Sequence, residues 1–379
     1  MSFEHDQMAF AARKSMLRGI QEASADWNIP SRLSPQTTLW IGTVDWPRPD
    51  SAFQDAQTGS SLAVEFKPPG HGKSEYIRGL GQAISYLKDF EFSTLVVPRY
   101  SSDGFSIGAY LSSVLSLELG RNLPLGLLQY DKDPSVLTKL SGLNARQGAT
   151  PEIPKNQRRV FWAYWRDLSQ HELLQILRIM DRDNLHFQQA FRSFWGKYRA
   201  RGRAMTWEGV HRKPSELDSK FYKSELHNVD LSLRHVGVTD SQGGLTDRGL
   251  QILRYGSIYG SDSTFFKSQV GRCILRDGGY LDLLFWIDDV QRKMTTESQR
   301  GNALGFYHAL DNELEEQGVI ARAPVAMSKA NFIRDELKIV NKLGLLQMRN
   351  QTQYFFPGEG LRINWRAVIS MLGEGSAPG

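Results

Sequence analysis

Three short segments between positions 46 and 87 decide how the N-terminal part of this chain folds: WPRPD at 46–50, SLAVEFKPPG at 61–70 and EYIRGLGQAISYL at 75–87. The second segment is apolar up to Glu65, which predicts a strand over Ser61–Phe66 that is buried on both faces. A charged Glu65 directly after such a run is unusual. The prolines of the first segment, together with Gly59, predict a loop or hairpin over 45–59.

The third segment predicts a helix over 74–87, with Ser74 as its N-cap. Helical spacing groups two sets of side chains on different faces of this helix. The apolar set, expected to face inward, is Ile77, Leu80, Ile84 and Leu87. The polar set recurs at steps of four and is Arg78, Gln82 and Tyr86.

The segments on either side alternate between strand and helix patterns. Helices are expected over His5–Trp27 and Ile107–Leu119, and strands over Thr38–Val44, Thr94–Pro98 and Pro124–Gln129. This alternation predicts an α/β domain over residues 1–140, with a mixed central sheet flanked by helices. Residues 141–156 are polar and contain two glycines and two prolines, so we expect a linker there.

Composition limits the class of protein. At 379 residues the chain is long enough for two or three domains, and its 40% hydrophobic content is that of a globular protein. No apolar run reaches the roughly 18 residues that a membrane span needs, and the N-terminus has no secretory signal pattern. The single cysteine, Cys273, excludes internal disulfides and Cys-rich zinc sites, so we expect a cytoplasmic protein. The net charge of +5 permits a nucleic-acid partner.

Residues 157–290 are expected to form a helical, winged-helix-like DNA-recognition region. Between Arg192 and Lys213, cations alternate with aromatic residues such as Phe194 and Trp195. One interpretation is a solvated helix face whose aromatic residues are core. The other is a surface where cations contact phosphates and aromatic rings stack on bases. The candidate nucleic-acid-binding residues are Arg78, Tyr86, Arg199, Arg201, Arg203 and Lys213.

The sequence pattern over residues 291–379 predicts a separate C-terminal module of two helices and two strands. One helix is expected to run from Ala303 to Gly318, and a second to run from Ser328 to Gly344. Two strands should follow, over Leu345–Arg349 and Gln353–Phe356. Helix, turn, helix and a two-stranded wing is the order of a winged helix, which often binds DNA. The mainly helical C-terminal part should therefore contain one or two winged-helix modules.

Three polar residues in the N-terminal segments are candidates for one catalytic site. Asp50 and Glu65 can supply the carboxylates that Mg²⁺ prefers, with the Phe66 carbonyl as a third oxygen. Lys67 lies two residues after Glu65, so both side chains leave the strand on the same face. A divalent metal neutralises phosphate oxygens and generates hydroxide, so this set suits phosphodiester hydrolysis.

These residues carry a resemblance to a known family. Pro49-Asp50 followed by Glu65-Phe66-Lys67 resembles the PD-(D/E)XK signature of restriction-endonuclease-like nucleases. Gln82-Ala83-Ile84-Ser85-Tyr86 is similar to the QxxxY helix motif of part of that superfamily. The resemblance implies that Asp50, Glu65 and Phe66 bind Mg²⁺, that Lys67 assists the nucleophile, and that Gln82 holds a water or a phosphate with Tyr86 supporting it. It also suggests Glu22 as a further acid from the first helix.

The resemblance predicts a Mg²⁺-dependent, site-specific endonuclease that hydrolyses double-stranded DNA, acting as a homodimer in the manner of a type II restriction enzyme. Two alternatives stay open. One is a catalytically inactive winged-helix protein that binds DNA and regulates. The other is a nuclease subunit of a different defence or mobile-element system, acting on single strands or RNA. The sequence also leaves open whether Asp45 or Asp55 takes the place of Asp50.

Overall fold

The structure is a computed structural model of the whole chain. It describes residues 3–22, 33–39, 47–55, 57–142, 168–200, 205–207, 210–212, 219–294, 301–319, 332–350 and 353–373. The chain divides into two compact units, and each is described here by itself. Unit 1 comprises Met1–Val160 with Glu313–Ser328, and unit 2 comprises Phe161–Asn312 with Lys329–Gly379. The predicted boundaries at 140, 156 and 290 stay predictions.

Unit 1 is built on a six-stranded mixed sheet in the order β1-β2-β3-β4-β5-β6. The strands are β1 (Thr37–Leu39), β2 (Ser51–Asp55), β3 (Ser61–Phe66), β4 (Phe92–Pro98), β5 (Leu125–Tyr130) and β6 (Thr138–Ser141). The three central strands β3, β4 and β5 are parallel, and the outer pairs are antiparallel. The predicted mixed sheet is confirmed.

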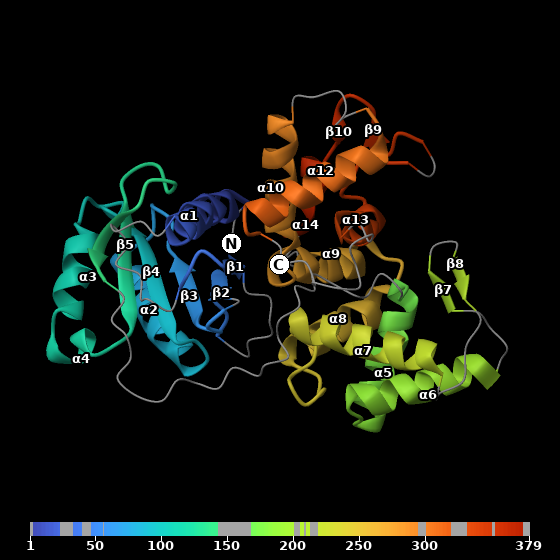
Figure 1. Ribbon diagram of the computed structural model, residues 1–379. Helices are drawn as coiled ribbons and strands as arrows, with labels where there is room; N and C mark the ends of the chain where they lie inside the picture. The colour runs from blue at the N-terminus through green and yellow to red at the C-terminus, as the bar shows by residue number, and fades with distance from the viewer. Residues whose placement is uncertain are drawn as a thin grey trace. The chain divides into compact units, whose positions relative to one another are not determined.

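Helices lie on both faces of this sheet, as Figure 1 shows for α1 (Phe3–Gln21) and α3 (Ile107–Leu115). Helices α2 (Lys73–Ser85) and α3 connect the parallel strands and share one core with β4 and β5. The 3₁₀ turn η2 (Tyr86–Lys88) continues α2, and the short α4 (Glu118–Arg121) follows α3. On the opposite face the Phe66 ring contacts the ring of His5 on α1, at 5.6 Å between centroids.

Several predicted elements of unit 1 differ from the structure at their ends. The first helix ends at Gln21 rather than at Trp27, which lies outside the described residues. The segment predicted as a loop or hairpin contains strand β2, because the prolines at 47 and 49 precede the paired residues rather than interrupt them. The helix predicted over 107–119 is divided into α3 and α4. Strand β6 was not predicted, and its residues are exposed or half-buried, without an apolar run.

The predicted inner face of α2 is correct at Leu80 and wrong at Ile77 and Ile84, while Leu87, in the following turn, is half-buried. Ile77 and Ile84 are 44% and 40% exposed, whereas the buried residues of this helix are Tyr76, Gly79, Leu80 and Ala83. The helix also begins one residue earlier than expected, with Gly72 rather than Ser74 at the N-cap position. The small residues Gly79 and Ala83 allow the helix to approach the sheet closely, and this close approach decides which face is buried.

Unit 2 is mainly helical. Its helices are α5 (Gln170–Asp183), α6 (Phe187–Ala200), α7 (Lys220–His235), α8 (Asp247–Tyr259), α9 (Thr264–Arg272), the π-helical η4 (Cys273–Asp277), α10 (Tyr280–Lys293), α12 (Ala303–Glu316), α13 (Phe332–Lys342) and α14 (Trp365–Gly373). The last residues of α12 belong to unit 1. A short hairpin pairs β7 (Met205–Trp207) with β8 (Val210–Arg212). Thr246 caps α8, because its hydroxyl accepts the Gly249 amide at 3.1 Å.

The C-terminal module has the two predicted helices but a different hairpin. Gly318 and Gly344, at φ 65° and 72°, follow α12 and α13 as expected. The predicted strand over Leu345–Arg349 is absent from these described residues, apart from one isolated bridge between Leu346 and Ile363. The paired strands are β9 (Phe355–Phe356) and β10 (Gly360–Leu361). The turn lies at Pro357-Gly358-Glu359, where Gly358 has a φ of 81° that favours glycine.

The aromatic residues of α6 are core residues. Phe194 is 2% exposed and Trp195 is fully buried, with its ring 5.3 Å from that of Tyr222 on α7. Stacking of these two rings on bases is therefore excluded, and the structure favours the interpretation of a helix with a buried aromatic face. Arg192, by contrast, is exposed.

Candidate active site

The β2–β3 hairpin brings Asp50 next to Glu65. In the antiparallel register Ser51 pairs with Val64 and Ala52 pairs with Ala63. Extending this register by one pair places Asp50 opposite Glu65, at the end of β3 where the strand leads into the loop. The Asp50 carboxylate accepts the Phe66 amide at 2.8 Å. A spacing of fifteen residues is therefore what a hairpin with its turn near position 58 requires.

Because successive side chains of a strand point to opposite faces, Glu65 and Lys67 project from one face and Phe66 projects from the other. Glu65 is only 3% exposed, and its Oε1 forms an ion pair with Lys67 Nζ at 2.8 Å. Lys67 Nζ also donates to Gln82 Oε1 at 2.9 Å. The structure thus brings the two charged residues of β3 and its following loop under one face of α2.

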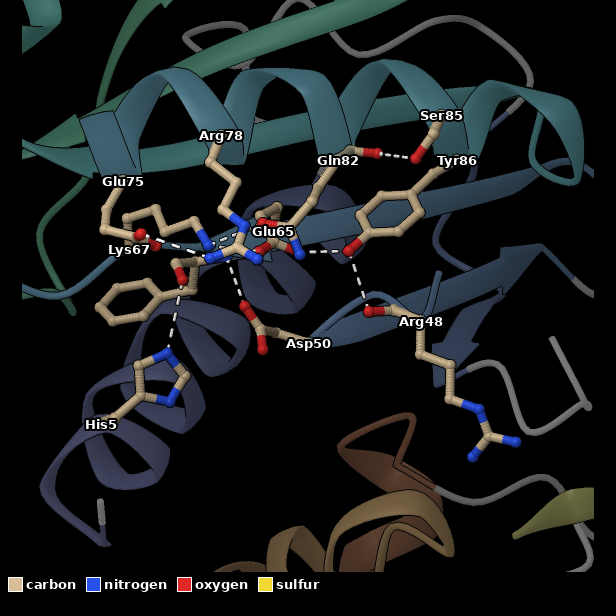
Figure 2. Close-up of polar contacts among 11 residues, drawn as sticks. His5, Arg48, Asp50, Glu65, Lys67, Glu75, Arg78, Gln82, Ser85 and Tyr86 are labelled. Atoms are coloured by element: carbon tan, nitrogen blue, oxygen red, sulfur yellow. Dashed lines mark hydrogen bonds and ion pairs between the residues drawn. The ribbon is translucent and has the colours of Figure 1, made fainter. Parts of the chain in front are cut away.

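Helix α2 contributes a second contact to Glu65. The Tyr86 hydroxyl, at the end of this helix, is hydrogen-bonded to Glu65 Oε2 and lies 2.9 Å from the Arg48 carbonyl (Figure 2). A hydroxyl has one proton, so it donates to one of these oxygens at a time. When Glu65 is protonated, it can donate to Tyr86 while Tyr86 donates to Arg48. Gln82 and Tyr86 therefore face the β3 pair from positions one helical turn apart.

Gly79 explains how the helix comes so close. A Cβ atom at this position would lie 2.6 Å from Lys67 Cε and 3.2 Å from Leu95 Cδ1. Any larger residue would collide with the side chain that bridges Glu65 and Gln82. Gly81, two residues later, has nothing within 4 Å of its Cβ position.

Helix α1 adds two residues that sequence reasoning missed. His5 Nε2 lies 3.4 Å from the Phe66 carbonyl, and Arg13 donates to the Asp50 carbonyl and to the Ser51 hydroxyl, both at 2.5 Å. Both side chains are buried. The signal for them was their position on the buried face of the helix with Ala9, Ala12 and Met16, where a charged residue needs a partner.

Burial dominates the electrostatics of the two carboxylates. It raises the pKa of Glu65 to about 7, with the nearby Asp50 charge acting in the same direction and with Lys67 and Tyr86 opposing. Burial also raises the pKa of Asp50, against the opposing effects of His5, the Phe66 amide, Lys67 and Arg13. Burial and the Glu65 charge raise the pKa of the Tyr86 hydroxyl, so Tyr86 stays protonated.

For the two cationic side chains near Asp50, burial and the neighbouring carboxylate charges shift the pKa in opposite directions. Burial lowers the pKa of the Arg13 guanidinium to about 10. For His5 burial lowers the pKa, but the hydrogen bond to Asp6 and the charges of Asp50 and Asp6 outweigh it, so the net shift is upward. The buried Glu65 and the half-buried Asp50 beside it are thus held with their charge incompletely compensated.

This donor set fits a hard divalent cation. Glu65, whose pKa is raised by burial and by the neighbouring Asp50 charge, would gain from a bound positive charge, and Mg²⁺ takes one or two protein carboxylates plus water and substrate phosphate. The Phe66 carbonyl lies on the same strand end as a third oxygen. Among the described residues no group of three or more His, Cys, Asp or Glu side chains is placed to hold a metal, so the fit rests on this smaller set.

Other candidate acids lie elsewhere. Both oxygens of Asp55 accept hydrogen bonds in the turns at the far end of β2. Glu22 is exposed and pairs with Arg18 at 2.9 Å, so it is not part of the site. Asp45 lies outside the described residues.

The structure describes the side chains of two of the six candidate nucleic-acid-binding residues, Arg78 and Tyr86. Arg78 is exposed on α2 and lies 3.4 Å from Glu75. Tyr86 is 1% exposed, so its predicted contact with nucleic acid is corrected to a contact with Glu65. The backbone of Arg199 belongs to α6 but its side chain is not described, and Arg201, Arg203 and Lys213 lie outside the described residues.

No protein-family model matches this chain, and no curated protein matches it. Within the described residues, no helix is long and apolar enough to cross a bilayer.

Proposed function

We propose that the protein is a Mg²⁺-dependent endonuclease of the restriction-endonuclease-like superfamily, which hydrolyses double-stranded DNA at specific sites as a cytoplasmic homodimer. One observation carries the proposal. Asp50, Glu65, Lys67 and Gln82, from the start of β2, the end of β3 and helix α2, form one contiguous polar cluster at the edge of a mixed sheet. Tyr86 extends the cluster through Glu65.

Each residue has a role that follows from its contacts. Asp50, Glu65 and the Phe66 carbonyl would hold Mg²⁺, which stabilises negative charge on the phosphate when it is bound. The Lys67 ammonium is fixed between Glu65 and Gln82 and can orient a water molecule or offset charge at phosphorus. Tyr86 keeps one Glu65 oxygen in place, because its hydroxyl stays protonated and donates.

The C-terminal module would recognise DNA as a winged helix. Helices α12 and α13, followed by the β9–β10 hairpin, have the element order of that motif, although the hairpin lies later in the chain than expected. Substrate specificity would then come from unit 2 and cleavage from unit 1. This division is part of the proposal.

A cleavage assay tests the enzymatic activity directly. Methylated and unmethylated plasmid and genomic DNA are incubated with the protein in Mg²⁺ or in EDTA, beside Lys67→Ala and Lys88→Ala variants. Lys88 is an exposed lysine at the end of η2, away from Glu65 and Gln82, so its variant is the matched control. Discrete fragments that require Mg²⁺, are lost in Lys67→Ala and persist in Lys88→Ala are expected.

The same assay separates the alternatives. Tight DNA binding without cleavage under any condition would reject the nuclease proposal in favour of an inactive DNA-binding protein. Metal-dependent degradation of single strands or RNA, with duplex DNA left intact, would retain the site chemistry but replace the proposed substrate. Cleavage is read on one gel with labelled duplex DNA, single-stranded DNA and RNA, and DNA binding is measured separately by a mobility-shift assay.

A further inference from the structure

Unit 2 contains a pocket that is separate from the proposed catalytic residues. It has a volume of about 220 Å³ and lies where the start of α5, the first turns of α9 and the end of α13 come together. All of its lining residues belong to unit 2. Its existence does not depend on the function proposed for unit 1.

One wall of the pocket is apolar. Leu173 from α5, Val270 from α9 and Ile339 from α13 are 2%, 4% and 5% exposed, and they line the pocket with Leu168, Ile274 and Leu343. Aliphatic side chains from three helices thus meet around one space. Such a surface favours the hydrocarbon part of a ligand over water.

The polar side of the pocket is cationic. Lys267 and Lys342 line it from two different helices, against the single acid Asp262, which is exposed to solvent. His171 lines it from the first turn of α5, with Nδ1 3.5 Å from the Ser261 hydroxyl. The lysines give this side a net positive charge.

The first turn of α5 adds amide donors to the same side. The capping box between Ser169 and Glu172 engages the amides of these two residues. The amides of Gln170 and His171, two other residues that line the pocket, lie in the first turn, where a helix offers donors to an anion. The lysine side chains and these amides therefore both favour an anionic ligand group.

The volume limits the size of the ligand. An apolar cavity of about 150 Å³ holds benzene, whereas drug-sized ligands occupy pockets of about 300 Å³ or more. A pocket of about 220 Å³ lies between these values. We propose that unit 2 binds a small organic anion here, with its carboxylate or phosphate beside Lys267 and Lys342 and a short apolar tail between the three helices.

Three ligands with the same six-carbon tail test the proposal on the full-length protein: hexanoate, hexan-1-ol and hexylamine. Binding is measured by isothermal titration calorimetry at pH 7.5, where the carboxylate is ionised. Hexanoate is expected to bind about tenfold more tightly than hexan-1-ol, and hexylamine more weakly than either. Hexyl phosphate, measured beside hexanoate, identifies which acidic group the pocket prefers.

Charge removal at one exposed lysine localises the binding. Lys267→Met keeps the length of the side chain and is expected to weaken hexanoate at least fivefold while leaving hexan-1-ol unchanged. Lys223→Met, at an exposed position on α7 outside the pocket, is the matched control and should bind like the parent protein. The proposal is overturned if hexanoate and hexan-1-ol bind equally, if Lys267→Met binds hexanoate like the parent, or if about 10 mM hexanoate produces no heat.

Discussion

Asp50 immediately precedes strand β2 and Asp55 is its last residue, and the pKa values of these two carboxyl groups are shifted in opposite directions. Asp55 accepts the amides of Ser34, Gln57 and Thr58 at 2.7–2.9 Å, together with nearby hydroxyl groups. These hydrogen bonds outweigh its burial and lower its pKa. Asp50 accepts the Phe66 amide and lies beside Glu65, and burial raises its pKa.

The opposite pKa shifts distinguish a carboxylate that holds a turn from one that a bound cation would stabilise. A carboxylate surrounded by donors is already neutralised by the fold, so adding a cation gains little. The buried Glu65 and the half-buried Asp50 keep part of the electrostatic cost of their charges, which a bound cation would remove. By this criterion the Asp50 end of β2 is suited to a metal, and the Asp55 end to holding a turn.

The largest effect is expected from Asp50→Asn. The amide keeps the shape of the side chain and can still accept the Phe66 amide, but it removes half of the carboxylate pair. We expect DNA cleavage to fall by about a thousandfold, the scale of losing one group that stabilises transition-state charge. The rate is measured on supercoiled plasmid at saturating Mg²⁺. Cleavage at the parent rate would show that Asp50 is not a metal ligand.

Asp55→Asn should affect stability instead. An amide cannot accept all of the donors that point at Asp55, so at least one buried donor loses its partner. We expect the free energy of unfolding to fall by about 2–3 kcal/mol, the scale for losing hydrogen bonds to a charged group. Urea titration measures this, and cleavage per folded molecule should be unchanged. Loss of cleavage at full stability would reverse the roles assigned to the two aspartates.

The contribution of Asp55 to the free energy of unfolding should also depend on pH. Because the folded-state pKa of Asp55 lies below its unfolded value near 3.8, the stabilisation is complete above that value and is lost as pH falls through the folded pKa. The difference in unfolding free energy between the parent and Asp55→Asn should therefore shrink between pH 6 and pH 2. A difference that stays constant with pH would mean that the charge of Asp55 does not contribute.

The smallest effects come from two glycines of α2 that differ only in what lies beside them. Gly79→Ala would place a methyl group against Lys67, which is held by Glu65 and Gln82, so we expect cleavage to fall about tenfold. Gly81→Ala meets open space and should stabilise unit 1 by about 0.5–1 kcal/mol with cleavage unchanged. Equal cleavage rates for the two variants would argue that Lys67 needs no fixed position.

Parts of the site could be predicted because local rules place them. The apolar run into Glu65 predicted strand β3 with its observed ends, Ser61 and Phe66. Alternation along the strand placed Glu65 and Lys67 on one face, and the four-residue step between Gln82 and Tyr86 placed both on one side of the helix. These patterns depend on neighbours in the sequence, which are fixed before any tertiary packing.

The inner face of α2 could not be predicted in the same way. Ile77 and Ile84 are more hydrophobic than Gly79 and Ala83, yet they are the exposed residues. Hydrophobicity favours burial, but close approach to Lys67 and Leu95 requires small side chains at the contact. The burial of Trp195 also depends on tertiary packing, because its ring contacts those of Phe191 and Tyr222.

The sequence by itself determined the central sheet pattern, the chemistry of Asp50, Glu65, Lys67 and Gln82, and the spacing that allows a hairpin to bring the first two together. Only the tertiary structure decided which aspartate of β2 lies beside Glu65, which face of α2 is buried, and that His5 and Arg13 belong to the site. The reason is that a periodic pattern reports the geometry of one element, whereas burial, pKa and partner choice depend on the elements packed against it.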